Sequence, residues 1–293
     1  LTYTVFIKGN KMSEKLNPLA GYFRKPELYV QIPTSGAFNP EIEKTVLDEI
    51  GILPMTAIDE ISMTNPDALL NGEAIVELIK SCVPSIPEPR ELCNVDAELL
   101  FLAIKLATYG KDISHLHTCS HCKAQAEYNI DINQILDKFP EVKKLEPVEW
   151  GDLKIHIQPP KLESVTRLAL IDVEQARILN SIQKTAESNT GENNAELEMA
   201  KQFAISFRKV SKQNVDLLIN SIHKIETPEG DVYEYEHIVE FIDNVPTSVV
   251  KDVKNKIDSL DIKTTDLSVF EFVCEECNEA DKVNFELNPV NFS

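Results

Sequence analysis

The sequence predicts a mainly helical α+β protein in which a four-cysteine zinc ribbon is split into two distant halves. The first observation is a pair of C-x-x-C turns, called knuckles below, which are formed by Cys119, Cys122, Cys274 and Cys277. The second is a set of apolar stripes of helical period before and between these turns. The residues between the two knuckles far outnumber those of a compact ribbon. We therefore interpret them as a large helical and β insertion.

The two knuckles repeat one unit, because matching segments follow them. Residues 129–133 come seven to eleven positions after Cys122, and residues 284–288 come at the same offsets after Cys277. Both segments alternate as β-strands do. Two thiolates on one tight turn can bind one side of a tetrahedral ion, so the two knuckles together provide the ligands of a zinc site. Four protein ligands leave Zn²⁺ no open position for water or substrate, which predicts a structural ion.

Two disulfides or four free thiols are the alternatives to a zinc site. A disulfide within one C-x-x-C turn is usually redox-active, and redox enzymes of that type place the turn in a βαβ pattern, which this sequence lacks. A histidine could replace one cysteine, but four cysteines suffice, so we interpret the nearby histidines as groups around the site or at the surface: His115, His117 and His121. Cys82 and Cys93 remain, and we expect them to be buried structural thiols.

The domain organisation follows from the positions of the knuckles and of the helical patterns. We expect an N-terminal arm, a mainly helical N-terminal domain, a discontinuous zinc ribbon and an inserted helical and β domain. In that order they cover residues 1–27, 28–110, 111–135 with 263–293, and 136–262. Met12-Ser13-Glu14 reads like an ordinary start, so residues 1–11 are expected to be an upstream extension.

The expected N-terminal domain combines a strand with several helices. Leu28–Ile32 alternates and stops at Pro33, which predicts a strand. Thr56 and Asp59 match a capping box at the start of a short helix, and Asn94 is expected to cap the strongest helix of the chain. The expected helices cover residues 57–63, 73–82 and 95–109.

The helix at 95–109 should be the central buried helix of this domain. It ends at Gly110, and the segment Leu99–Ile104 is apolar nearly all round. A helix of this kind is normally enclosed by other elements. An exposed stripe that binds a partner is the alternative.

The rest of the chain alternates between helical and strand patterns. A loop without apolar side chains at 187–194 separates two long helices, which we expect to pack antiparallel. The expected helices are 134–139, 162–183, 196–210, 237–242 and 247–260. The expected strands are 153–157, a hairpin of 222–226 with 232–235, and the ribbon strands 269–273 and 283–287.

The charge and composition exclude several classes of protein. The formal net charge is −19 and no basic block is visible, so phosphate backbones and anionic membranes should repel the chain. We therefore expect no nucleic-acid partner. No apolar run reaches about 18 residues, so no membrane span is expected. The sequence has no secretion-signal pattern, and six cysteines with four assigned to metal fit a reducing cytosol.

We expect a protein that is not an enzyme. The sequence has no phosphate-binding glycine loop, no H-E-x-x-H and no G-x-S-x-G motif. Glu234, Glu236 and His237 are the nearest approach to an acidic catalytic cluster, and a helix start explains them better. A redox or transfer enzyme that uses the C-x-x-C thiols is the alternative.

Three stretches resemble one family of tailed-phage proteins, the T4-type baseplate hub assembly proteins. They are Gln31–Phe38 (QIPTSGAF), Leu53–Glu60 (LPMTAIDE) and Asn65–Gly72 (NPDALLNG). The two C-x-x-C pairs also suit this family. The resemblance covers roughly residues 28–135 and, weakly, the end of the chain, and it does not cover the insertion.

The resemblance implies a phage protein that acts in assembly of the tail baseplate. We expect an assembly factor or chaperone for the central hub, with hub or tail proteins as partners, in the host cytoplasm during assembly. A minor structural component of the baseplate hub in the virion is the first alternative. A zinc-ribbon regulator that binds nucleic acid is the second.

Overall fold

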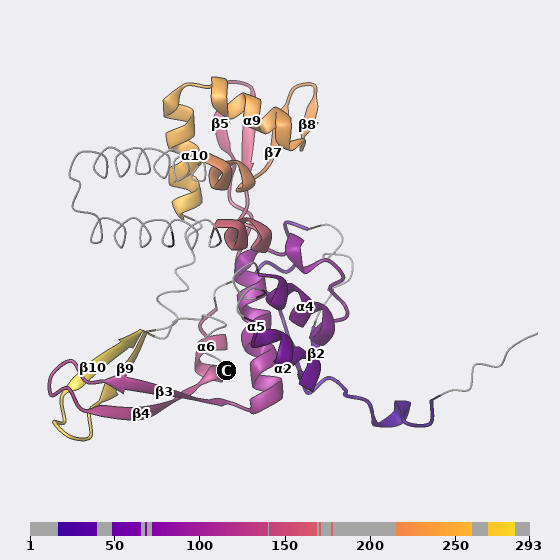
Figure 1. Cartoon of the computed structure of the whole chain (residues 1–293). Coiled ribbons are helices and arrows are strands. Elements are labelled where there is room, and N and C mark those ends of the chain that lie inside the picture. The colour runs from indigo at the N-terminus through magenta and orange to yellow at the C-terminus, as the bar shows by residue number, and fades with distance from the viewer. Residues whose placement is uncertain are drawn as a thin grey trace, which may run out of the picture.

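The structure is a computed structural model, and it mixes helices with antiparallel strands around one central helix. It describes residues 17–39, 49–65, 68, 72–139, 141–168, 170, 177, 215–259 and 269–284. Helix α5 (Asn94–Tyr109) lies in the middle of Figure 1, between the N-terminal helices and the rest of the chain. Two hairpins lie near its C-terminal end, and a four-stranded sheet with two helices lies beyond its N-terminal end.

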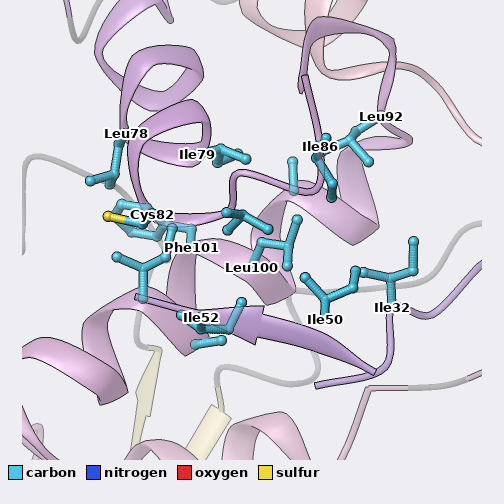
Figure 2. Packing of buried hydrophobic residues seen from close by; sticks show 14 of the residues in the cluster. Ile32, Ile50, Ile52, Leu78, Ile79, Cys82, Ile86, Leu92, Leu100 and Phe101 are labelled. Carbon is cyan, nitrogen blue, oxygen red and sulfur yellow. The ribbon is translucent and has the colours of Figure 1, made fainter. Parts of the chain in front are cut away.

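The N-terminal part packs helices and one small hairpin against α5. Its elements are η1 (Ala20–Tyr22), β1 (Leu28–Val30), β2 (Ile50–Ile52), α2 (Ala57–Met63), α4 (Glu73–Cys82) and η2 (Pro89–Glu91). Ile52, Ile79 and Leu100 are fully buried in one apolar cluster, and Figure 2 shows them pointing toward one another from β2, α4 and α5. The predicted burial of the central helix is confirmed, which excludes the exposed stripe.

The predicted capping box at the start of α2 is confirmed, whereas the predicted Asn94 cap at the start of α5 is wrong. Thr56 and Asp59 form the expected capping box. Asn94, however, is the first residue of α5, and the cap position belongs to Cys93 without a side-chain bond. Tertiary pairing fixes this entry, because the Asn94 N–H donates to the Pro160 carbonyl at 2.8 Å. The Asn94 side chain donates to Glu98 instead of capping.

Two hairpins and a short helix follow α5. The hairpins pair β3 (Asp112–Thr118) with β4 (Gln125–Asp131), and β9 (Val269–Val273) with β10 (Ala280–Asn284). Strand β10 begins three residues before the predicted 283, because Ala280 already pairs with Val273. Helix α6 (Ile132–Leu136) begins two residues before the predicted 134, because the Asp131 side chain accepts the Asn133 N–H and caps it.

The four-stranded sheet lies in the region between the knuckles. Its antiparallel order is β5-β6-β7-β8, and helices α9 and α10 pack with it in a second apolar cluster. Strand β8 begins and ends earlier than the predicted 232–235, because Thr227 pairs with Gly230 across a tight turn. The elements are β5 (Val148–Trp150), β6 (Leu153–Ile157), β7 (Ile222–Thr227), β8 (Gly230–Val232), α9 (Tyr235–Asn244) and α10 (Thr247–Ser259).

Several predictions lie wholly or mostly outside the described residues. They concern the extension at 1–11, the loop at 187–194 and the helix at 196–210. The helix predicted at 162–183 begins as expected, and residues 162–168 are helical. The domain boundaries stay a prediction.

Candidate metal centre

The first knuckle is a tight turn between β3 and β4. The Cys119 N–H donates to the Ala124 carbonyl at 2.9 Å, and the Lys123 N–H donates back to the Cys119 carbonyl at 3.0 Å. Lys123 adopts a left-handed conformation with φ of 64°. These bonds bring the backbone around so that Cys119 and Cys122 lie on one side of the turn.

The second knuckle repeats the same turn between β9 and β10. The Cys274 N–H donates to the Glu279 carbonyl at 3.0 Å, and the Asn278 N–H donates to the Cys274 carbonyl at 2.8 Å. Asn278 has φ of 56°. Each of these residues stands at the same offset from its first cysteine as its counterpart in the first knuckle. The duplication predicted from the sequence is therefore present in the backbone.

The four predicted ligands come together. Their sulfur atoms all lie within 4.8 Å of one another. Across the two hairpins, Cys122 Sγ lies 3.7 Å from Cys274 Sγ, and Cys119 Sγ lies 3.8 Å from Cys277 Sγ. Cys119 and Cys274 are buried, Cys277 is half-buried and Cys122 is exposed.

The spacing of the sulfurs fits a metal ion better than disulfides. A disulfide joins sulfurs about 2.05 Å apart, and among the described cysteines none is bonded to another. Four thiolates about 2.3 Å from a tetrahedral zinc ion lie about 3.8 Å from one another. The sulfur separations of 3.7 and 3.8 Å between the two hairpins match that value. The donor set is therefore suited to a thiophilic ion.

Backbone donors favour the thiolate form at one ligand. The N–H groups of Cys277 and Glu276 point at the sulfur of Cys274 and lower the pKa of its thiol to about 7. A deprotonated sulfur is the form that binds metal. The turn of the second knuckle thus favours the metal-binding form at Cys274, whereas burial and the neighbouring sulfurs raise the pKa of the Cys277 thiol.

Asp281 of β10 connects the second hairpin to the first knuckle. Its Oδ2 accepts from His117 Nε2 at 2.9 Å and from the Ser120 N–H at 2.7 Å, and its Oδ1 accepts from Ser120 Oγ at 2.8 Å. These donors, His117 first, hold the pKa of the Asp281 carboxyl well below its usual range. Sequence reasoning missed this residue. Its only signal was an acidic side chain at an inward position of an alternating strand, four residues after Cys277.

Aromatic side chains of the two hairpins contact one another. Tyr128 of β4 lies 4.5 Å from Phe272 of β9 between ring centroids, and Phe270 lies 6.4 Å from Phe272. Phe270 also belongs to the apolar cluster that includes Leu102 of α5. The cysteine cluster is therefore connected through packed side chains to the central helix.

The other sequence-predicted groups occupy varied positions. His117 contacts Asp281, and His121 is exposed, as expected of groups outside the ligand set. The side chain of His115 lies outside the described part of the chain. Cys82 and Cys93 are buried as predicted, and burial raises the pKa of both thiols, that of Cys82 to about 11.

The acidic residues near α9 form a helix start. Glu234 is the residue before the first turn of α9 and lies 3.8 Å from His237, with both side chains exposed. This position favours negative charge because of the helix dipole. The expectation that the chain is not an enzyme stays a prediction.

The family model described as T4 bacteriophage base plate protein matches residues 40–292. The chain belongs to this family. The match includes both knuckles and the region between them, which the sequence resemblance did not cover. No curated protein and no solved structure matches the chain.

Family membership gives this baseplate protein a role related to the phage tail baseplate. It indicates the virion tail baseplate as the location and other baseplate proteins as partners. Among the described helices, none has the length and apolar character needed to cross a membrane.

Proposed function

We propose that this baseplate protein is an assembly factor, or chaperone, for the baseplate hub, and that it acts by binding another protein without catalysis. Membership of the base plate family supports the baseplate part of this proposal. The observation that carries the binding part is a set of large apolar side chains exposed on two elements that are linked through the ion pair of Arg24 with Asp59. Exposed apolar groups of this kind are typical of protein–protein contacts.

The first of these elements is the N-terminal arm around η1. Tyr22 is 87% exposed, and Leu19 and Phe23 are more than half exposed. The arm is held at its base by Arg24, whose guanidinium donates to the Pro54 carbonyl and to the Ser81 carbonyl, each at 2.7 Å. These bonds anchor residue 24, and the exposed apolar side chains of Leu19, Tyr22 and Phe23 lie just before this anchor.

The second element is α2, which is next to the base of the arm. Ile58 is 75% exposed and Ile61 is 69% exposed. Asp59 of the same helix binds Arg24 at 3.2 Å, so α2 and the arm are joined directly. A hub subunit that covers both elements would remove this apolar surface from water, while the net charge of −19 keeps the complex soluble.

Within this proposal the four cysteines hold a structural Zn²⁺. The ligands would be Cys119, Cys122, Cys274 and Cys277, and the chemistry that the ion supplies is cross-linking of the two hairpins. All four ligands are protein sulfurs, which supports a structural and not a catalytic ion. In this view residues 111–135 and 263–293 form one ribbon, interrupted by the domain at 136–262.

A pull-down from infected cells tests the binding role. We expect the tagged protein to recover hub proteins of the tail, and the double variant Ile58→Ser with Ile61→Ser to lose them. Val273→Ser is the matched control, because Val273 is also exposed but lies on the ribbon hairpin. Recovery of no tail protein by the wild type, or equal recovery by all three proteins, contradicts the proposal.

Mass spectrometry of purified virions separates the helper from the alternative, a minor structural component of the hub. A helper is absent from finished particles, although it is present in infected cells. A component is present in finished particles at a fixed ratio to the other baseplate proteins.

A further inference from the structure

The two ribbon hairpins are joined by a contact that involves no cysteine. Asp281 of β10 receives three hydrogen bonds from the first hairpin, one from His117 and two from Ser120, at 2.7 to 2.9 Å. The side chains of Asp281 and His117 are only 12% and 19% exposed. Bonds from several donors to a shielded carboxylate are stronger than those of an exposed pair.

We propose that Asp281 is a positioning residue that closes the two hairpins on each other before an ion binds, an inference that rests on the proposed metal centre. Through this contact Asp281 sets the separation of thiols from different hairpins. Ion binding then requires little rearrangement of the chain.

Ser120 connects the Asp281 contact to the cysteine ligands of the first knuckle. Ser120 stands between Cys119 and Cys122, so the bond from its N–H to Asp281 fixes the knuckle turn itself. Asp281 stands four residues after Cys277 on the strand that leaves the second knuckle. One carboxylate therefore orients both cysteine pairs.

The two hairpins repeat the same pattern, but only one of them has the residues that make this polar contact. The first hairpin has Ala126 at the position that corresponds to Asp281. The second hairpin has Phe272 and Glu275 at the positions that correspond to His117 and Ser120. At Phe272, which corresponds to His117, the contact between the hairpins is instead aromatic, because Tyr128 packs on Phe272. One substitution at Asp281 therefore alters all three of these hydrogen bonds at once.

Zinc affinity tests the proposal when it is measured by competition with a chromogenic chelator. Asp281→Asn should weaken zinc binding by about tenfold or more, which is the usual effect of losing a partner that orients a ligand. Glu271→Gln is the matched control, because Glu271 pairs with Lys282 at 3.1 Å on the exposed face of the same hairpin. The control should bind zinc as the wild type does. Equal affinity for Asp281→Asn and the control overturns the proposal.

Hydrogen exchange of the metal-free protein gives a second readout, which does not depend on the ion. The Ser120 amide should be protected in the wild type and should exchange faster in Asp281→Asn, while the amides of Leu100 and Ile104 in α5 stay protected and show that the chain is folded. If Asp281→Asn does not fold, His117→Ala removes one of the three bonds and should give a smaller loss of the same kind. Unchanged Ser120 exchange in these variants overturns the closing role.

The two proposals fail in distinguishable ways. A wild-type protein that binds no zinc contradicts the metal centre, and with it the effect of Asp281 on affinity. Ser120 exchange in that same protein still decides whether Asp281 holds the hairpins together.

Discussion

Lys123 and Asn278 adopt the same left-handed backbone conformation, with φ of 64° and 56°. Each is the fourth residue after the first cysteine of its knuckle, and each donates its N–H to the carbonyl of that cysteine. Two segments far apart in the sequence thus build one turn twice. The likeness extends from the spacing of the cysteines to the backbone that carries them.

The left-handed positions predict how the knuckles respond to substitution. Lys123→Val should destabilise the zinc-loaded protein by about 1–2 kcal/mol, because a β-branched residue is strongly disfavoured at positive φ. Lys123→Asn should lower the free energy of unfolding much less, since asparagine tolerates this conformation, as Asn278 shows, and only the exposed bond from Lys123 Nζ to the Ser120 carbonyl is lost. Urea unfolding measures both. Glu127→Val, on the exposed face of β4, is the control, and an equal loss from Glu127→Val and Lys123→Val would contradict the explanation.

Thiol counting under native and unfolding conditions separates the two kinds of cysteine. We expect a thiol reagent to modify few or none of the cysteines in the zinc-loaded protein and four after a chelator is added. Denaturant should expose the remaining two, Cys82 and Cys93, which are buried and have raised pKa values. A count of four before the chelator is added would show that the sulfurs hold no ion.

Local patterns predicted those elements whose signals lie within one segment. Helices α2 and α4 have the bounds that capping and periodicity indicated, because Thr56, Asp59 and the stripe of 73–82 act within their own turns. The cysteine cluster was also predictable, since the repeated C-x-x-C spacing itself specifies two matching turns. These features depend little on the rest of the chain.

Features that depend on distant partners were missed. Strand β2 has only three residues around Gly51, and it is a strand because it pairs with β1. A Cβ at Gly51 would lie 3.2 Å from Pro26 Cγ, so a side chain there would force Pro26 to shift by a few tenths of an ångström. In the same way, the Asn94 prediction was wrong because a bond to Pro160 fixes the helix entry. Asp281 gave only a weak signal within its own strand, since its partners come from the other hairpin.

Asp96 predicts a specific pH dependence of stability. Burial raises the pKa of its carboxyl to about 6, although Thr34 donates both its N–H and its hydroxyl to it. The ordinary value is 3.8. Between these values the folded chain holds a proton that the unfolded chain has released, so the contribution of Asp96 to stability falls as pH rises from about 4 to about 6.

Comparison of Asp96→Asn with the wild type isolates this effect, because the other carboxyl groups are common to both proteins. The free energy of unfolding of the variant, relative to the wild type, should increase over that pH range by up to about 3 kcal/mol. Urea unfolding at several pH values measures it. A difference that is constant with pH, or that decreases, would contradict the assignment.

Substitution of two leucines of α5 should have separable effects on the N-terminal core and on the two hairpins that carry the cysteines. Leu100 and Leu102 are both fully buried, but Leu100 belongs to the N-terminal cluster, whereas Leu102 packs with Ile113 and Phe270 of the hairpins. Leu100→Ala and Leu102→Ala should each lower the free energy of unfolding, measured with urea, by about 2–5 kcal/mol. Only Leu102→Ala should also speed hydrogen exchange in β3 and β4. Faster exchange of these strands in Leu100→Ala alone would contradict this division.

The metal content of the purified protein tests the account most directly. Elemental analysis should find one zinc ion per chain in the wild type, and none in a variant in which Cys119 and Cys274, one from each knuckle, are changed to Ser. A wild-type protein without metal, or a variant that keeps its zinc, would contradict the central claim that one ion joins residues from two distant parts of the chain.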